Sequence, residues 1–182
     1  MKYSKYFKDY NKSIYHLLDN LDPSLIDKSV ELILNCKKNN GKVYIVGNGG
    51  SSSIASHVSV DLVKVANVPS STFNNTNLIT CFANDYGHAN WIKEAIKAYT
   101  NQNDILILIS SSGSSKNIVN AGQYCKDNNI PLITLTGFQA ENPLNKLGNV
   151  NIHIPSNKYN FIEMTHHIIL LSIVDIFAES LI

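Results

Sequence analysis

Several short, largely apolar runs rich in β-branched residues set the pattern of this chain. The clearest is Ile105 to Ile109, and Val43 to Val46 and Leu132 to Thr136 are similar in length and character. Segments long enough to form helices separate these runs. A strand that is apolar on both sides is buried on both faces, which is typical of a parallel sheet covered by helices. The chain is therefore predicted to be an α/β protein.

Weaker patterns complete the predicted elements. Short strands are expected near 71–73 and at 150–154. Helices are expected over 52–66, over 78–100 with a break at 84–87, from the serine-rich segment 110–115 to about 127, and over 161–181. The first 41 residues predict a helical hairpin, because apolar residues recur there at helical spacing around a break at Asp22-Pro23-Ser24. Such a hairpin packs on its own domain or on a partner subunit. We predict two parts, a hairpin over 1–41 that serves oligomerisation and a domain over 42–182.

Composition narrows the classes of function. The chain has a net charge of +1, from 15 basic and 14 acidic residues, so neither nucleic acid nor an anionic membrane is an expected partner. All basic residues are Lys, so a phosphate site must use hydroxyls, backbone N–H groups or Lys. The three cysteines are widely spaced, and the N-terminus shows no signal-peptide pattern. The longest apolar stretch, 168–178, is too short to cross a bilayer. These features favour a cytoplasmic protein.

Two unusual loops follow predicted strands, and ligands of open parallel sheets bind beyond the carboxyl ends of strands. The first is Gly47 to Ser51, with the sequence GNGGS, which opens a helix whose N-terminus offers free N–H groups. The second is Ser110 to Ser115, with five hydroxyls around one glycine. A tight turn and a flexible linker are the alternatives. Ser52 replaces the third glycine of a dinucleotide loop, and no P-loop Lys is present, so an anion site of another kind is predicted.

Titratable residues lie on two of the predicted helices. His57 and Asp61 are four residues apart, so they share a helix face below the GNGGS loop. On the last helix, Glu163 is close in sequence to His166 and His167. That helix is apolar on nearly every side and is expected to be buried, and charged groups on a buried helix need partners. A structural ion pair or a hydrogen-bonded core histidine is the alternative to a catalytic role.

The two loops, Asn84-Asp85 between them and the leading helices resemble the sugar isomerase (SIS) domain family, in particular its phosphoheptose isomerase branch. The resemblance implies a doubly wound, five-stranded parallel sheet flanked by helices, and a homotetramer with active sites shared between subunits. It also implies a set of residues that bind the sugar phosphate. They are Asn48, Gly49, Gly50, Ser51, Asn84, Asp85, Ser110, Ser111, Ser112, Ser115 and Glu163.

Members of this branch carry four zinc ligands. Two of them, a His and a Glu four residues after it, lie on the helix that follows the GNGGS loop, and the other two, a Gln and a His, lie on the last helix. The matching positions here are His57, Asp61, Glu163 and Leu171. The resemblance implies a zinc site made by His57, Asp61 and Glu163. Asp61 is the expected base, and His167 or His166 is the expected acid, since Leu171 carries no proton.

The function that the resemblance implies is the metal-assisted conversion of sedoheptulose 7-phosphate to D-glycero-D-manno-heptose 7-phosphate. A member of this family that binds a sugar phosphate or a protein partner without catalysis is the alternative. A change at the position of the family's acid favours the alternative, whereas the His57–Asp61 pair and the two intact loops favour an enzyme.

Overall fold

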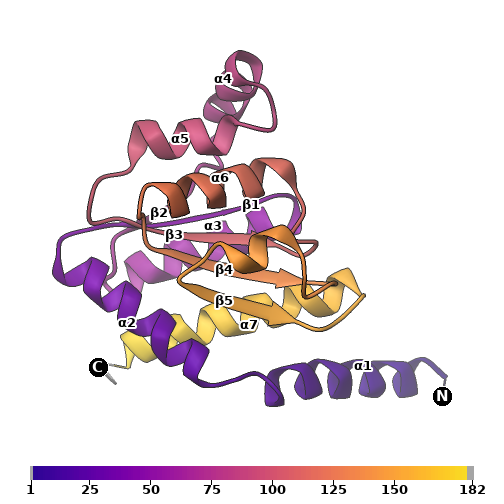
Figure 1. The fold of residues 1–182 in the computed structure, drawn as a ribbon. Helices are drawn as coiled ribbons and strands as arrows, with labels where there is room; N and C mark the ends of the chain where they lie inside the picture. Colours follow the sequence, from indigo (N-terminus) through magenta and orange to yellow (C-terminus); the bar gives the residue numbers. More distant parts are fainter. Residues whose placement is uncertain (1, 180–182) are drawn as a thin grey trace.

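The computed structural model describes residues 2–179, and its centre is a five-stranded parallel sheet (Figure 1). The strands lie in the order β2-β1-β3-β4-β5 and every neighbouring pair is parallel. Their bounds are β1 (Val43–Gly47), β2 (Ser70–Ser71), β3 (Ile105–Ser110), β4 (Leu132–Gly137) and β5 (Val150–Ile154). From β1 the chain adds β2 on one side and then β3 on the other. The loops after β1 and β3 therefore diverge and leave a crevice between them.

Helices cover both faces of the sheet, as expected for strands that are apolar on both sides. The helices are α1 (Lys2–Asp19), α2 (Ser24–Lys38), α3 (Gly50–Lys64), α4 (Thr76–Tyr86), α5 (Trp91–Tyr99), α6 (Lys116–Asp127), α7 (Tyr159–Ala178) and a short 3₁₀ helix, η1 (Pro143–Lys146). One apolar core joins α2, α3 and α7 to one face, and a second joins α5, α6 and η1 to the other. The predicted fold class is thus confirmed, including the break that separates α4 from α5.

The helix α7 is longer than the apolar stretch at its end. It begins at Tyr159 and spans 20 residues with a mean hydropathy of 1.6, long and apolar enough to cross a membrane by length and composition alone. Half of it is nevertheless buried inside the protein, and Ile162, Ile169 and Ile173 belong to the core beneath the sheet. The expectation that no apolar segment here reaches membrane-spanning length was wrong, and α7 packs as a core helix.

The two leading helices differ in how they pack. In α2, Val30 and Ile33 are buried in the core of the domain, so this helix packs on its own chain. The helix α1 extends beyond the edge of the sheet (Figure 1). It packs on the body through Leu17 and Leu18 near its end and through Tyr10, whose ring lies 4.7 Å from that of Phe161. Tyr6 on the same helix keeps 67% of its surface exposed.

Candidate active site

A cavity of about 140 Å³ lies in the crevice between the loops that follow β1 and β3. Its walls come from three places: the GNGGS loop, the serine loop Ser110–Ser115 and the first turn of α7. The lining residues are Asn48, Ser51, Ile109, Ser110, Ser111, Ser112, Ser115, Tyr159 and Glu163. Seven of the residues predicted to bind the sugar phosphate are thus brought together, while Tyr159 was not predicted.

An amide pair ties the two loops to each other. The Asn48 Nδ2 donates to Asn117 Oδ1, and the Asn117 Nδ2 donates back to Asn48 Oδ1, both at 3.0 Å. Asn117 is buried in the first turn of α6, 69 residues further along the chain. A pair of reciprocal hydrogen bonds holds the two amide planes in one relative orientation, so it fixes the width of the crevice. Sequence reasoning missed Asn117, because nothing local distinguishes it from other asparagines.

The serine loop presents hydrogen-bond donors suited to an anion. Among residues 2–179, the buried Ser111 Oγ has no hydrogen-bond partner. Buried hydroxyls are rarely left unpaired, so this group points to a ligand that accepts a hydrogen bond. The N-termini of α3 and α6 begin at Gly50 and Lys116 beside the same cavity. Helix N-termini attract negative charge, so the site suits a phosphate without an arginine.

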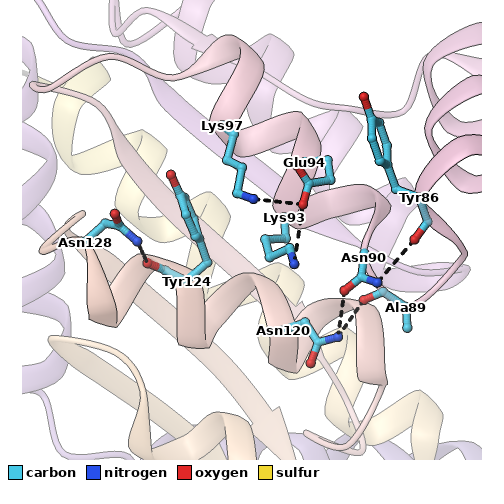
Figure 2. A network of polar contacts seen from close by, with 9 residues as sticks. All are labelled: Tyr86, Ala89, Asn90, Lys93, Glu94, Lys97, Asn120, Tyr124 and Asn128. Atoms are coloured by element: carbon cyan, nitrogen blue, oxygen red, sulfur yellow. Dashed lines mark hydrogen bonds and ion pairs between the residues drawn. The ribbon is translucent and has the colours of Figure 1, made fainter.

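Asn84 and Asp85 do not line this cavity. Both are exposed on α4, where Asn84 Nδ2 donates to Asp85 Oδ1 at 2.9 Å. The segment after α4 is fastened to α6, since Asn120 Nδ2 donates to the Ala89 carbonyl at 2.8 Å (Figure 2). Asn90 and Glu94 continue this polar network along α5. Within one chain, Asn84 and Asp85 therefore face solvent.

Three side chains in contact, Asp61, His57 and His167, connect α3 to α7 further along the same helices. His57 Nε2 lies 3.1 Å from Asp61 Oδ2, and His57 Nδ1 lies 2.9 Å from His167 Nε2. The two imidazole rings meet edge to face, with centroids 4.9 Å apart. Burial and the neighbouring His57 both lower the pKa of His167, while Asp61 opposes them. His167 is therefore a neutral imidazole at neutral pH, suited to exchange protons.

Glu163 does not contact these three side chains; it covers the start of α3. A methyl group added at Gly50 would come within 2.5 Å of Glu163 Oε2, so the carboxylate sits directly over this glycine. The position fits the positive end of the α3 dipole. It also places a hydrogen-bond acceptor on the wall of the cavity.

The zinc ligands implied by the family pattern do not converge in this chain. A zinc site needs several donors about 2.0–2.3 Å from one point, and within residues 2–179 no three His, Cys, Asp or Glu side chains form such a group. His57 engages Asp61 through one ring nitrogen and His167 through the other, and Glu163 covers Gly50 instead. Leu171 packs against the core. The residues as placed do not fit zinc.

His166, one of the two expected acids, does not lie in the site. Its side chain is fully buried, and its Nε2 lies 3.0 Å from the Thr136 carbonyl oxygen. Burial lowers the pKa of His166 to about 4, partly offset by the hydrogen bond to Thr136. Neighbouring residues of a helix point about 100° apart, so α7 turns His166 to the core and His167 toward His57 of α3. Of the two, only His167 is placed to act as an acid.

The buried His166 makes stability depend on pH. The unfolded chain takes up a proton near pH 6.5, whereas the folded chain does so only near pH 4. The unfolded state thus binds more protons in this window, and the free energy of unfolding is expected to fall by roughly 3 kcal/mol as the pH drops through it. Urea unfolding at pH 7 and pH 4 measures the fall. His166→Gln, which retains a donor for Thr136 and does not titrate, should show a smaller fall; equal falls would contradict the assignment.

Comparison with known proteins agrees with this architecture. The SIS domain model matches residues 5–137. A phosphoheptose isomerase from Campylobacter jejuni is 32% identical over 162 residues, which cover 85% of this chain and 86% of that protein. The structure of a phosphoheptose isomerase from Francisella tularensis superposes with a TM-score of 0.85 at 28% identity, covering 98% of this chain and 97% of the other. One from Neisseria gonorrhoeae, at 23% identity, shares the fold with a TM-score of 0.86 and 97% coverage of both chains. The chain belongs to the SIS domain family, in its branch of phosphoheptose isomerases, which are sugar-phosphate isomerases.

Proposed function

We propose that this enzyme converts sedoheptulose 7-phosphate to D-glycero-D-manno-heptose 7-phosphate. One observation carries the proposal: a cavity lined by hydroxyls and a group of titratable side chains lie along the same two helices, α3 and α7. The resemblance to enzymes named phosphoheptose isomerase supports the choice of a seven-carbon sugar. The three cysteines are free and two of them are buried, which fits a cytoplasmic location.

In this proposal the serine loop holds the phosphate. Hydroxyls of the loop and the N–H groups at the start of α6 donate hydrogen bonds to the phosphate oxygens. Asn48 and Glu163 also line the cavity, and their side-chain oxygens can accept hydrogen bonds from the hydroxyls of the sugar. The sugar chain then extends along α3 and α7 toward His57, Asp61 and His167.

The reaction moves one proton between neighbouring carbon atoms. A base removes a proton from C1 of the ketose, a cis-enediol forms, and an acid returns a proton to C2. The side chains of Asp61, His57 and His167 supply the titratable groups for these two transfers. These two transfers use side chains alone, since within residues 2–179 no three His, Cys, Asp or Glu side chains converge on one point.

The test is an NMR assay of purified protein with sedoheptulose 7-phosphate. We expect new anomeric signals of the aldose to grow in with time, and the C1 proton to exchange with D₂O. If five- to seven-carbon ketose phosphates bind but none is turned over, with or without added zinc, the non-catalytic alternative is correct.

Removing two hydroxyls from the serine loop tests the phosphate site. Ser112→Ala with Ser115→Ala is expected to weaken sugar-phosphate binding at least tenfold, since a hydrogen bond to a charged group contributes about 1.5–3 kcal/mol. Isothermal titration calorimetry measures the affinity. Ser114→Ala is the matched control, because the Ser114 hydroxyl donates to the Ser112 carbonyl at 3.1 Å and does not line the cavity. Unchanged affinity in the double variant would place the phosphate elsewhere.

We propose further that the enzyme is a homotetramer held through α1 and α7. The first turns of α1 expose Tyr3, Tyr6 and Phe7, by 84%, 67% and 64%, and such aromatics are typical of an interface. A neighbouring subunit would also bring the exposed Asn84 and Asp85 within reach of a site. Sedimentation at micromolar concentration should give four times the chain mass of 20.2 kDa. Phe7→Lys should yield smaller species, whereas Lys8→Glu should not; a monomeric wild type would refute the proposal.

A further inference from the structure

We propose that Tyr159 is a phosphate-binding residue, whose ring forms part of the cavity wall and whose phenol donates a hydrogen bond to the phosphate of the bound sugar. Phe138 acts through Tyr159 as a positioning residue. The inference rests on the proposed function, in which this cavity holds a sugar phosphate. It adds a residue that the sequence did not indicate.

The cavity holds its anion with neutral donors. Among the described residues that line it, none is Lys, and Glu163 is a carboxylate. A phosphate there depends on hydroxyl and N–H donors, and a hydrogen bond to a charged oxygen is roughly twice as strong as one between neutral groups. Each hydroxyl on the wall therefore contributes to affinity.

Tyr159 supplies one more such donor, from a different part of the fold. Among the described residues of α7, Tyr159 is the one that brings a hydroxyl to the cavity. Its side chain is 57% exposed, so the ring lies at the rim of the cavity. Within residues 2–179 the phenol makes no hydrogen bond to another protein group, and its donor is therefore available to a ligand.

The size of the cavity decides which part of the ligand Tyr159 meets. Pockets that enclose a whole small molecule measure roughly 300–1,000 Å³, whereas this cavity measures about 140 Å³. It therefore takes one end of a sugar phosphate, and the hydroxyls of the serine loop suit that end to the phosphate. A phenol on the wall of the same small space donates to the phosphate oxygens rather than to the sugar.

The residue that supports the Tyr159 ring has a strained backbone. Phe138 directly follows β4 and has φ of +55°, a left-handed conformation that bulky residues rarely adopt. Such strain persists only where the surroundings enforce it, and it is concentrated at functional sites. The Phe138 N–H donates to the Ser156 carbonyl at 3.0 Å, and the Phe138 ring meets the Tyr159 ring at 65°, with centroids 4.7 Å apart. This edge-to-face contact is a favourable arrangement of two aromatic rings and orients Tyr159.

The end of β4 also holds the serine loop. The Gly137 N–H donates to the Ser111 carbonyl at 2.8 Å, and Phe138 is the next residue along the chain. Two consecutive residues thus contact the loop that receives the phosphate and the tyrosine on α7. The placement of Tyr159 relative to the serine loop is therefore set by the end of β4, where the strained residue lies.

The first experiment titrates the protein with inorganic phosphate and with sedoheptulose 7-phosphate by isothermal titration calorimetry. Tyr159→Phe removes the hydroxyl and keeps the ring, and it is expected to weaken the binding of both ligands about three- to tenfold. KM should rise by the same factor while kcat stays unchanged, since this bond is made in the ground state and in the transition state alike. Tyr99→Phe is the matched control, because Tyr99 is 51% exposed and does not line the cavity.

A double-mutant cycle tests the positioning role of Phe138. Phe138→Leu keeps an apolar side chain but loses the ring, so it should weaken phosphate binding and raise KM with kcat unchanged. Phe138→Tyr retains the ring and should restore the affinity. In a chain that already carries Tyr159→Ala, Phe138→Leu should not change the affinity further. An equal loss in both backgrounds would mean that Phe138 does not act through Tyr159.

The outcomes separate this inference from the function on which it rests. Unchanged phosphate affinity in Tyr159→Phe overturns the inference and leaves the isomerase intact. A loss for the sugar phosphate but not for inorganic phosphate also overturns it, because the phenol would then contact the sugar. A wild type that binds phosphate more tightly than Tyr159→Phe but turns over no ketose phosphate supports the inference and refutes the proposed function.

Discussion

Asp61→Asn is expected to lower the turnover number at least a hundredfold while sugar-phosphate binding stays nearly unchanged. Asparagine has the size of aspartate, but it carries no charge and cannot act as a base. The same exchange beside the histidine of a serine protease lowers kcat about 10⁴-fold. A smaller factor is expected here, because 30% of the Asp61 side chain is exposed and solvent screens the pair.

Two measurements identify the role of Asp61. Steady-state kinetics should show a loss in kcat rather than a rise in KM, and calorimetry should show the affinity for the phosphate retained, since Asp61 does not line the cavity. Asp61→Glu is the control that restores the charge and should recover much of the rate. Near-normal turnover in Asp61→Asn would exclude a catalytic contribution and make Glu163 the next candidate.

The sheet and its loops could be predicted because their causes are local. Continuous apolar runs such as Ile105–Ile109 specify buried parallel strands, and glycine or serine clusters at their ends specify loops. The pairing of His57 with Asp61 could be predicted for the same reason, since a spacing of four residues places them on one helix face. The structure confirms that pair, at 3.1 Å.

The rest of the site depends on how distant segments pack. The helix α7 is apolar on nearly every side, so the pattern does not say which of the adjacent His166 and His167 faces the core. Contact with α3 and with β4 decides this, and it brings His167 to His57 across 110 residues of sequence. The Asn48–Asn117 pair joins residues 69 positions apart, and the periodicity of the sequence does not show it either. Family resemblance likewise does not show that Asn84 lies outside the cavity of its own chain.

Gly113→Ala is the substitution expected to damage the phosphate loop most. Gly113 has φ of +61°, a left-handed conformation that costs an L-residue about 1–2 kcal/mol. A β-carbon there would also overlap the side chain of Asn142. Asn142 is buried, donates to the Gln139 carbonyl at 2.7 Å and accepts from the Asn145 N–H at 3.0 Å, so it cannot turn away without losing both bonds. Overpacking of this kind costs about 1–3 kcal/mol, for a total of roughly 2–5 kcal/mol.

A second glycine separates the two contributions to this loss. Gly87 has φ of +78°, but among the described residues no atom lies within 4 Å of the place that an added β-carbon would take, so Gly87→Ala carries the backbone strain alone. Urea unfolding should therefore show a loss for Gly113→Ala that exceeds the loss for Gly87→Ala by about 1–3 kcal/mol. Sugar-phosphate binding should fail in Gly113→Ala and persist in Gly87→Ala, because only Gly113 lies within the serine loop. Equal losses in both variants would mean that Asn142 yields freely, and the serine loop would then be held by its own backbone rather than by the side chain packed against it.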